Sequence, residues 1–193
     1  MFQENKNLRL QKILMDDIVK QALIKWPNVP DCYGWLGLDA RGNWFMRDDH
    51  VQAQGAFALG TLQSKGTLLT HEKLLEFINR NYEPDAQGQW YFQNGPQRVY
   101  VELEITPLIW RVKDDFSIED HTGKSGRIRS CLVDEKGHVY LVADTGFGLV
   151  HTLDVCYVAE AVDIGLWHPQ DVIGDDLARK FDYVLSPKLR SKT

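Results

Sequence analysis

The stretch that decides the fold is residues 89–112, Gln-Trp-Tyr-Phe-Gln-Asn-Gly-Pro-Gln-Arg-Val-Tyr-Val-Glu-Leu-Glu-Ile-Thr-Pro-Leu-Ile-Trp-Arg-Val. Its aromatic start leads into Asn94-Gly95-Pro96-Gln97, where Asn and Gly tolerate a positive φ and Pro fixes φ at a turn value. From Val99 to Ile105, apolar residues alternate with Tyr and Glu, and a period of two is typical of a strand with one buried face. The stretch therefore predicts a β-hairpin that continues into a third extended segment.

The composition is that of an ordinary globular chain. The 193 residues are 44% hydrophobic and 25% charged, which suits one sizeable domain or two small subdomains. The formal net charge of −5 argues against a general nucleic-acid-binding protein, because such a protein needs a basic face to neutralise phosphates. The basic cluster of Lys188, Arg190 and Lys192 is expected to be a solvated tail.

Neither a targeting segment nor a redox-active framework is evident. The N-terminus lacks the apolar run of a signal peptide, and no segment approaches the ~20 apolar residues that span a bilayer. The cysteines, Cys32, Cys131 and Cys156, are odd in number and widely spaced, so they predict no disulfide framework and no Cys-x-x-Cys metal pair. We therefore expect a cytoplasmic protein with no metal, no cofactor and no membrane partner.

The longest helical pattern lies at the N-terminus. Residues 6–26 predict an amphipathic helix of about five to six turns, which Pro27 ends. Its apolar stripe consists of Leu8, Met15, Val19, Ala22 and Trp26. Contiguous exposed apolar surface is rare on monomers, so we expect the stripe to pack on the chain's own sheet, with Trp26 largely buried. The alternative is a homodimer seam, because Leu8, Met15 and Ala22 are seven residues apart.

The remaining segments alternate hairpins with short helices. Hairpins are expected over residues 33–47 and 126–142, and helices over residues 71–81, 153–164 and 176–181. Residues 48–69 indicate short strands and loop, and the polar residues 113–124 predict a linker. We therefore expect an α+β fold in which repeated antiparallel β-hairpins pack with the long N-terminal helix and several short helices. The expected parts are the N-terminal helix (1–27), a first hairpin–helix–hairpin subdomain (28–113), a second hairpin-plus-helix subdomain (114–187) and a basic tail (188–193).

One turn pattern occurs three times. The pattern is Asp-x-x-Gly followed closely by an aromatic and an apolar residue, and its copies are Asp39–Gly42, Asp85–Gly88 and Asp134–Gly137. The Asp side chain can hydrogen-bond the backbone two residues on, and Gly takes a left-handed conformation without penalty. The copies lack the further oxygen ligands of a calcium loop. We therefore expect three hairpin turns, each followed by a strand.

Four short motifs carry a family resemblance. They are Gly34-Trp-Leu-Gly-Leu-Asp39, Phe77-Ile-Asn-Arg-Asn-Tyr82, Gln93-Asn-Gly-Pro-Gln-Arg-Val-Tyr-Val101 and Gly146-Phe-Gly-Leu-Val-His151. With them the chain resembles, over most of its length, a family of uncharacterised proteobacterial proteins of unknown function. The resemblance implies no activity. A loosely similar uncharacterised family also alternates such hairpins with short helices, and a signalling role has been suggested for it.

Motifs with known chemistry are incomplete in this chain. His121-Thr-Gly-Lys-Ser125 imitates the end of a phosphate-binding loop, but that loop needs a Gly at position 118, which is Ile. Asp144-Thr-Gly-Phe-Gly148 lacks the third glycine of a dinucleotide loop, so we expect a bulge there. The histidines show no metal-ligand spacing, and no Ser stands in a Gly-x-Ser-x-Gly motif.

Two groups of residues remain as candidate sites. Asn94, Gln97 and Arg98 belong to the most distinctive expected turn, whose backbone does not require the last two side chains. His151 and Asp154 lie at an expected helix N-terminus, where free N–H groups can hold an anion. The alternative, which we favour, is that Asp154 holds His151 in a capping contact. We expect a non-enzymatic binding or regulatory module for a small ligand or a protein partner, with contacts at the turn. The alternative is a small enzyme or anion binder that uses His121, His151 and Asp154.

Overall fold

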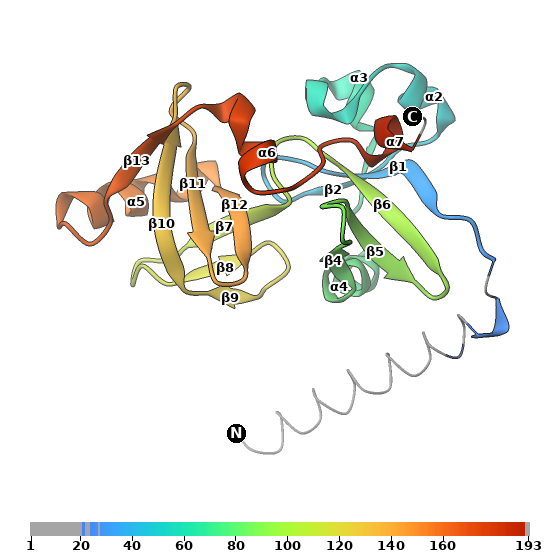
Figure 1. The fold of residues 1–193 in the computed structure, drawn as a ribbon, viewed down its shortest axis with the longest axis horizontal. Helices are drawn as coiled ribbons and strands as arrows, with labels where there is room; N and C mark the ends of the chain where they lie inside the picture. The colour runs from blue at the N-terminus through green and yellow to red at the C-terminus, as the bar shows by residue number, and fades with distance from the viewer. Residues whose placement is uncertain (1–20, 22–23, 27, 192–193) are drawn as a thin grey trace.

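Figure 1 shows the protein as a computed structural model, in which residues 21, 24–26 and 28–191 are described. This part of the chain is mostly β-structure. It forms two mixed sheets that lie side by side in the figure and share one apolar core. The helices are short and lie at the margins of the sheets.

The first sheet has the strand order β3-β2-β1-β6-β5-β4. Its strands are β1 (Cys32–Leu38), β2 (Trp44–Met46), β3 (Thr67–Leu68), β4 (Tyr82–Pro84), β5 (Trp90–Asn94) and β6 (Gln97–Leu103). The two central strands, β1 and β6, are parallel, and the other neighbours are antiparallel. The predicted hairpin at the start of residues 89–112 is confirmed as β5 and β6.

The second sheet has the strand order β13-β10-β11-β12-β7-β8-β9. Its strands are β7 (Leu108–Val112), β8 (Ile118–Asp120), β9 (Ser125–Gly126), β10 (Ile128–Asp134), β11 (Val139–Ala143), β12 (Gly146–Val150) and β13 (Pro169–Val172). Parallel pairs join β7 to β12 and β10 to β13. The third extended segment of residues 89–112 is β7, which therefore joins the other sheet.

The helical segments are short because packing against the sheets, rather than helix length, stabilises them. They are α2 (Asp49–Ala53), η1 (Phe57–Leu59), α3 (Leu62–Lys65), α4 (Glu72–Arg80), η2 (Thr152–Asp154), α5 (Val155–Asp163), η3 (Gly174–Asp176), α6 (Leu177–Lys180) and α7 (Pro187–Arg190). The predicted helices near residues 71–81, 153–164 and 176–181 are confirmed as α4, α5 and α6. Among the described residues, no helix is long and apolar enough to cross a membrane.

The core includes buried residues of both sheets, among them four of the five residues of β7. Ile109 and Trp110 are fully buried in β7, and Leu38 and Leu103 are fully buried in the first sheet. Trp110 also donates through its indole N–H to the carbonyl of Leu141 at 3.1 Å, so the one polar atom of this large side chain is satisfied. Strands buried on both faces are near-continuous apolar runs, which explains the Leu-Ile-Trp sequence of β7.

The predicted fold class is wrong. The central pairings of both sheets include parallel strands, so the fold is not a set of antiparallel hairpins packed with helices. Parallel neighbours need long crossover connections, and pairing between distant segments leaves no local pattern in the sequence. Most of the predicted helix over residues 6–26 lies outside the described residues. Trp26 is described and is 52% exposed, so the prediction that it is largely buried is wrong.

Four loops share one turn geometry, and they are Asp39–Gly42, Asp85–Gly88, Asp120–Gly123 and Asp134–Gly137. In each, the Asp N–H donates to the carbonyl four residues on, and the Gly N–H donates to the Asp carbonyl. The Asp carboxylate accepts from the N–H groups two and four residues on. The Gly φ angles lie between 73° and 86°, a left-handed conformation that favours glycine. The three predicted hairpin turns are confirmed, because they join β1 to β2, β4 to β5 and β10 to β11.

The segment 113–124 is not the linker that its polarity predicted. It contains the turn from β7 to β8, strand β8 itself, and the fourth Asp-x-x-Gly turn between β8 and β9. In the first of these turns Phe116 takes the left-handed position, with φ 61°. The sequence pattern missed the fourth turn because Lys124 and Ser125 follow it in place of aromatic residues.

The C-terminal segment ties the two sheets together. After β13 in the second sheet, the chain passes through α6 and crosses to the first sheet, where α7 lies against β1 and β6 (Figure 1). The N–H of Val184 donates to the Gly88 carbonyl and the N–H of Leu103 donates to the Leu185 carbonyl. Buried Glu102 accepts from the Ser186 hydroxyl and from the N–H of Lys188. Lys188, which the sequence placed in a solvated tail, is therefore half-buried against the first sheet.

Candidate functional site

His121 occupies the second position of the fourth turn and points into the core. Its Nδ1 accepts from the Ile109 N–H at 3.3 Å, and its ring lies 5.6 Å from the rings of both Trp44 and Tyr82. Burial lowers the pKa of His121 from 6.5 to about 4, although Asp120 acts in the opposite direction. His121 is therefore neutral at pH 7 and joins the turn to β7 and to the first sheet.

His151 and Asp154 are buried at the start of α5. His151 accepts through Nδ1 from the Leu153 N–H at 3.1 Å, which caps η2, and burial lowers its pKa. Asp154 accepts from Arg111 Nε at 2.6 Å and from the Val112 N–H at 3.1 Å. Burial raises the pKa of Asp154, but the hydrogen bonds from Arg111 and Val112 outweigh it and lower the pKa below the usual range.

The three candidate residues of the enzymatic alternative therefore have separate tasks in the fold. His121 contacts Ile109 on one stretch of β7, whereas Asp154 holds Arg111 and Val112 further along the same strand. Neither of the two cavities described below is lined by any of the three. In the described part of the chain, no group of three His, Cys, Asp or Glu side chains is placed to hold a metal ion.

The candidate turn at the tip of β5 and β6 is partly engaged. Gln97 donates through its side-chain amide to the Pro30 carbonyl at 2.9 Å. Arg98 lies over the ring of Tyr91 at 4.8 Å from its centroid, and Tyr91 neighbours a stacked pair of Tyr33 and Tyr100. Asn94 is exposed and pairs with Gln97 across the hairpin. A partner contact at this turn remains a prediction.

A second region of interest is β13, one of the two edge strands of the second sheet. Of the four edge strands in the described part, β13 has four residues, whereas β3, β4 and β9 have two, three and two. Pro169, Gln170 and Asp171 are exposed, and Figure 1 shows the strand at the outer margin of the sheet. An edge strand presents unpaired N–H and C=O groups, which can pair with another chain.

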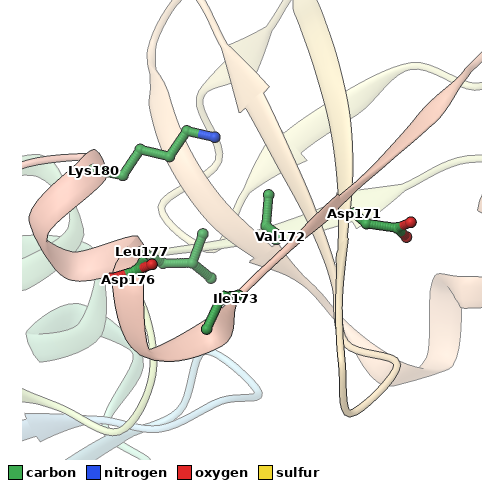
Figure 2. A pocket seen from close by; sticks show the side chains of 6 residues that line it. All are labelled: Asp171, Val172, Ile173, Asp176, Leu177 and Lys180. Carbon is green, nitrogen blue, oxygen red and sulfur yellow. The ribbon is translucent and has the colours of Figure 1, made fainter.

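A cavity of about 310 Å³ lies at the C-terminal end of β13. Its lining residues are Asp171, Val172, Ile173, Asp176, Leu177 and Lys180 (Figure 2). Leu177 is buried, whereas Ile173 is 62% exposed. In Figure 2 the amine of Lys180 extends from α6 above the apolar side chains, and Asp171 points away from them. Asp176 pairs with Arg179 at 2.8 Å, but Lys180 has no carboxylate partner within the described residues.

A second cavity, of about 380 Å³, lies at the N-terminal end of the same strand. Its lining residues are Ile128, Arg129, Ser130, Cys131, Leu166, Trp167, His168 and Gln170. Trp167 is 8% exposed and forms apolar wall, while Arg129, His168 and Gln170 are exposed. The two cavities therefore flank one open strand.

A family model matches most of the chain. Residues 15–188 match the model of the family DUF2944, which is described as a protein of unknown function (DUF2946). The chain belongs to this family. The expected resemblance to an uncharacterised family is therefore confirmed, and membership of DUF2944 brings no activity with it. No curated protein matches the chain.

Two solved structures are similar to this DUF2944 chain. A DUF1285 family protein from Silicibacter pomeroyi DSS-3 is 13% identical with a TM-score of 0.44, and the match covers 69% of this chain and 72% of that one. A DUF1285 family protein from Shewanella baltica OS155 is 16% identical with a TM-score of 0.43, and the match covers 68% of this chain and 94% of that one. Both TM-scores are below 0.5, and no functional statement follows from either.

The sequence of this DUF2944 protein does not predict a strand at β13. Pro169-Gln-Asp-Val172 has no clear period of two, and Pro is unusual in strands except at edges and first positions. The start of β13 at a Pro, directly after Trp167 and His168, is the signal that could have indicated an edge strand. Its parallel pairing with β10, from Cys131–Pro169 to Asp134–Val172, has no counterpart in any local pattern.

Proposed function

We propose that this protein is a non-enzymatic binding module, which takes an extended segment of a protein partner along the open edge of β13. The observation that carries the proposal is the position of β13 between two cavities that it helps to line. A peptide that adds to a sheet edge gains affinity from main-chain hydrogen bonds and specificity from pockets for its side chains. The edge and its two cavities supply both elements.

The dimensions suit a short peptide. The four residues of β13 span roughly 13 Å at about 3.3 Å per residue, so a peptide of four to six residues reaches from one cavity to the other. The cavity at Ile173 and Leu177 has apolar lining and suits an apolar side chain. Lys180 and Asp171 at its margin suit polar neighbours in the same peptide.

The enzymatic alternative has less support. His121, His151 and Asp154 each hold a backbone N–H group that would otherwise be unpaired. Removing any of these side chains would leave that N–H group without its acceptor, and none of them lines either of the two cavities described above. A binding role does not require His121, His151 or Asp154 to react with a substrate.

The proposal is tested with a phage library that displays random ten-residue peptides with free C-termini. Peptides selected on the full chain are synthesised, and their affinity is measured by fluorescence polarisation. We expect Ile173→Asp to weaken binding at least tenfold. Ile164→Asp is the matched control, because Ile164 has nearly the same exposure, 66% against 62%, but lines neither cavity.

Backbone N-methylation of the tightest peptide separates strand addition from other binding modes. Alternate residues of an added strand donate to the edge, so methylation of one alternate set should abolish binding while methylation of the other set leaves it. No enriched peptide, a uniform effect of N-methylation, or equal losses for Ile173→Asp and Ile164→Asp would overturn the proposal.

A further inference from the structure

The cavity at the N-terminal end of β13 contains polar side chains that the fold does not use. Arg129, Ser130, His168 and Gln170 line it, and none of these side chains makes a hydrogen bond or an ion pair with another described residue. No acidic residue lines the cavity. The Arg129 guanidinium, the Ser130 hydroxyl and the Gln170 amide line one cavity without partners, so they offer hydrogen-bond donors to an anionic group. Arg suits a carboxylate because it can donate two parallel hydrogen bonds.

The strands leave room for a chain end at this place. Pairing between β10 and β13 begins at Cys131 and Pro169, whereas β10 itself begins at Ile128. The first residues of β10 therefore have no strand beside them on this side, and the cavity lies there. A peptide that continued as a strand past Pro169 would have no β13 residue to pair with, so the cavity suits the end of a peptide better than its middle.

From these observations we infer that the cavity binds the C-terminal carboxylate of the partner, with the last side chain against Trp167 and Leu166. This inference rests on the proposed strand addition at β13 and specifies its partner. A carboxylate alone fills a small part of about 380 Å³, so the space suits a whole terminal residue. The peptide runs antiparallel to β13, because only this direction brings its C-terminus to the Pro169 end. Its residue three or four positions earlier then lies at Ile173.

The test compares three forms of one selected peptide by fluorescence polarisation. They are the free acid, the C-terminal amide, and the free acid extended by Gly-Gly. We expect the amide and the extended form to bind the wild type at least tenfold more weakly than the free acid. On Arg129→Gln, acid and amide should bind within about twofold of each other, because the donor that distinguishes them is gone. Arg127→Gln removes the same charge at a position two residues before Arg129 that does not line the cavity, and it should keep the full wild-type discrimination.

Each other outcome has a defined meaning. Equal binding of acid and amide to the wild type overturns the inference, and so does unchanged discrimination on Arg129→Gln. If the extended peptide binds as well as the free acid and depends on an internal Asp or Glu, the anion is a side chain and the C-terminal assignment fails. An alternating N-methylation pattern that persists in these cases leaves the strand-addition proposal intact, so the two failures are distinguishable. Matching urea-unfolding midpoints of Arg129→Gln and Arg127→Gln show that both variants are folded.

Discussion

At the scale of single residues, His121 is the clearest case of a polar group committed to the fold. The Ile109 N–H donates to Nδ1, so the neutral ring carries its proton on Nε2. Nε2 is buried and has no hydrogen-bond partner within the described part of the chain. The ring stands between Trp44 and Tyr82, and an N–H next to aromatic faces is only weakly compensated. Protonation would break the Ile109 hydrogen bond and bury a charge.

This arrangement predicts a pH dependence of stability. The pKa of His121 is about 4 in the folded protein, below its ordinary value of 6.5, so the folded state binds fewer protons than the unfolded state between these values. The contribution of neutral His121 to the free energy of unfolding is fully present above pH 6.5 and is lost as the pH falls toward 4. Between pH 7 and pH 5 the loss should be roughly 2 kcal/mol, at about 1.4 kcal/mol per pH unit.

Urea unfolding at both pH values measures this loss. His121→Gln should be less stable than wild type at pH 7 but should lose roughly 2 kcal/mol less on acidification. Val139→Ala, a core variant that keeps His121, should retain the wild-type pH dependence. Identical pH dependence in wild type and His121→Gln would contradict this account of the residue.

Two glycines in the same turn geometry predict very different costs. Gly88 and Gly137 have φ angles of 73° and 81°. A Cβ at Gly88 would stand 2.2 Å from the Asp182 carbonyl oxygen, whereas a Cβ at Gly137 would meet nothing within 4 Å. Gly137→Ala should therefore cost about 1–2 kcal/mol of conformational strain, and Gly88→Ala should cost at least ~2 kcal/mol more because backbone must move. Urea unfolding of both variants checks this, and equal losses would show that the C-terminal segment does not pack on this turn.

At the scale of elements, the C-terminal segment of residues 183–190 depends on Glu102. Burial raises the pKa of this β6 carboxyl, against the hydrogen bond from Ser186. Its two oxygens accept from the Ser186 hydroxyl and the Lys188 N–H, which fixes the start of α7 on the sheet. Hydrogen bonds to charged groups contribute about 1.5–3 kcal/mol each, so this buried side chain contributes strongly to the attachment of α7.

Replacing Glu102 with Met should therefore lower the free energy of unfolding by about 2–4 kcal/mol and loosen α7. Amide hydrogen exchange at Lys188 should accelerate at least tenfold. Glu76→Met is the control, because Glu76 is exposed and its i,i+4 contact with Arg80 contributes at most ~0.5 kcal/mol. Unchanged exchange at Lys188 in Glu102→Met would mean that other contacts hold the segment.

At the scale of the whole molecule, the sequence predicts what is local. The Asp-x-x-Gly turns and the hairpins around them depend on residues within a few positions of one another. The pattern of residues 48–69 predicts short strands and loop, but the segment also forms α2, η1 and α3. Contacts with residues elsewhere in the chain stabilise these helices. The buried guanidinium of Arg47 donates to the carbonyls of Ser64 and Gly55, which fixes this segment over the first sheet.

The parallel pairings and the candidate surface are not local and could not be predicted. β1 pairs with β6 across an interval that contains four other strands, and β10 pairs with β13 across two strands and α5. The motif that begins at His121 resembles the end of a phosphate-binding loop, yet His121 belongs to an Asp-x-x-Gly turn. Arg129 and His168 lie far apart in the sequence, and only the start of β13 beside β10 brings them to one cavity.

The most direct test of the central claim is residue-resolved hydrogen exchange of the β13 amides, with and without a saturating concentration of the tightest free-acid peptide. The account predicts that exchange slows at least tenfold at alternate residues among Gln170, Asp171, Val172 and Ile173, because only outward-facing N–H groups gain a partner. The exchange rates of the amides in β4, an edge strand of the first sheet, should not change. Binding that leaves β13 exchange unaltered, or slows all four amides equally, would contradict the claim that this edge takes the partner's strand.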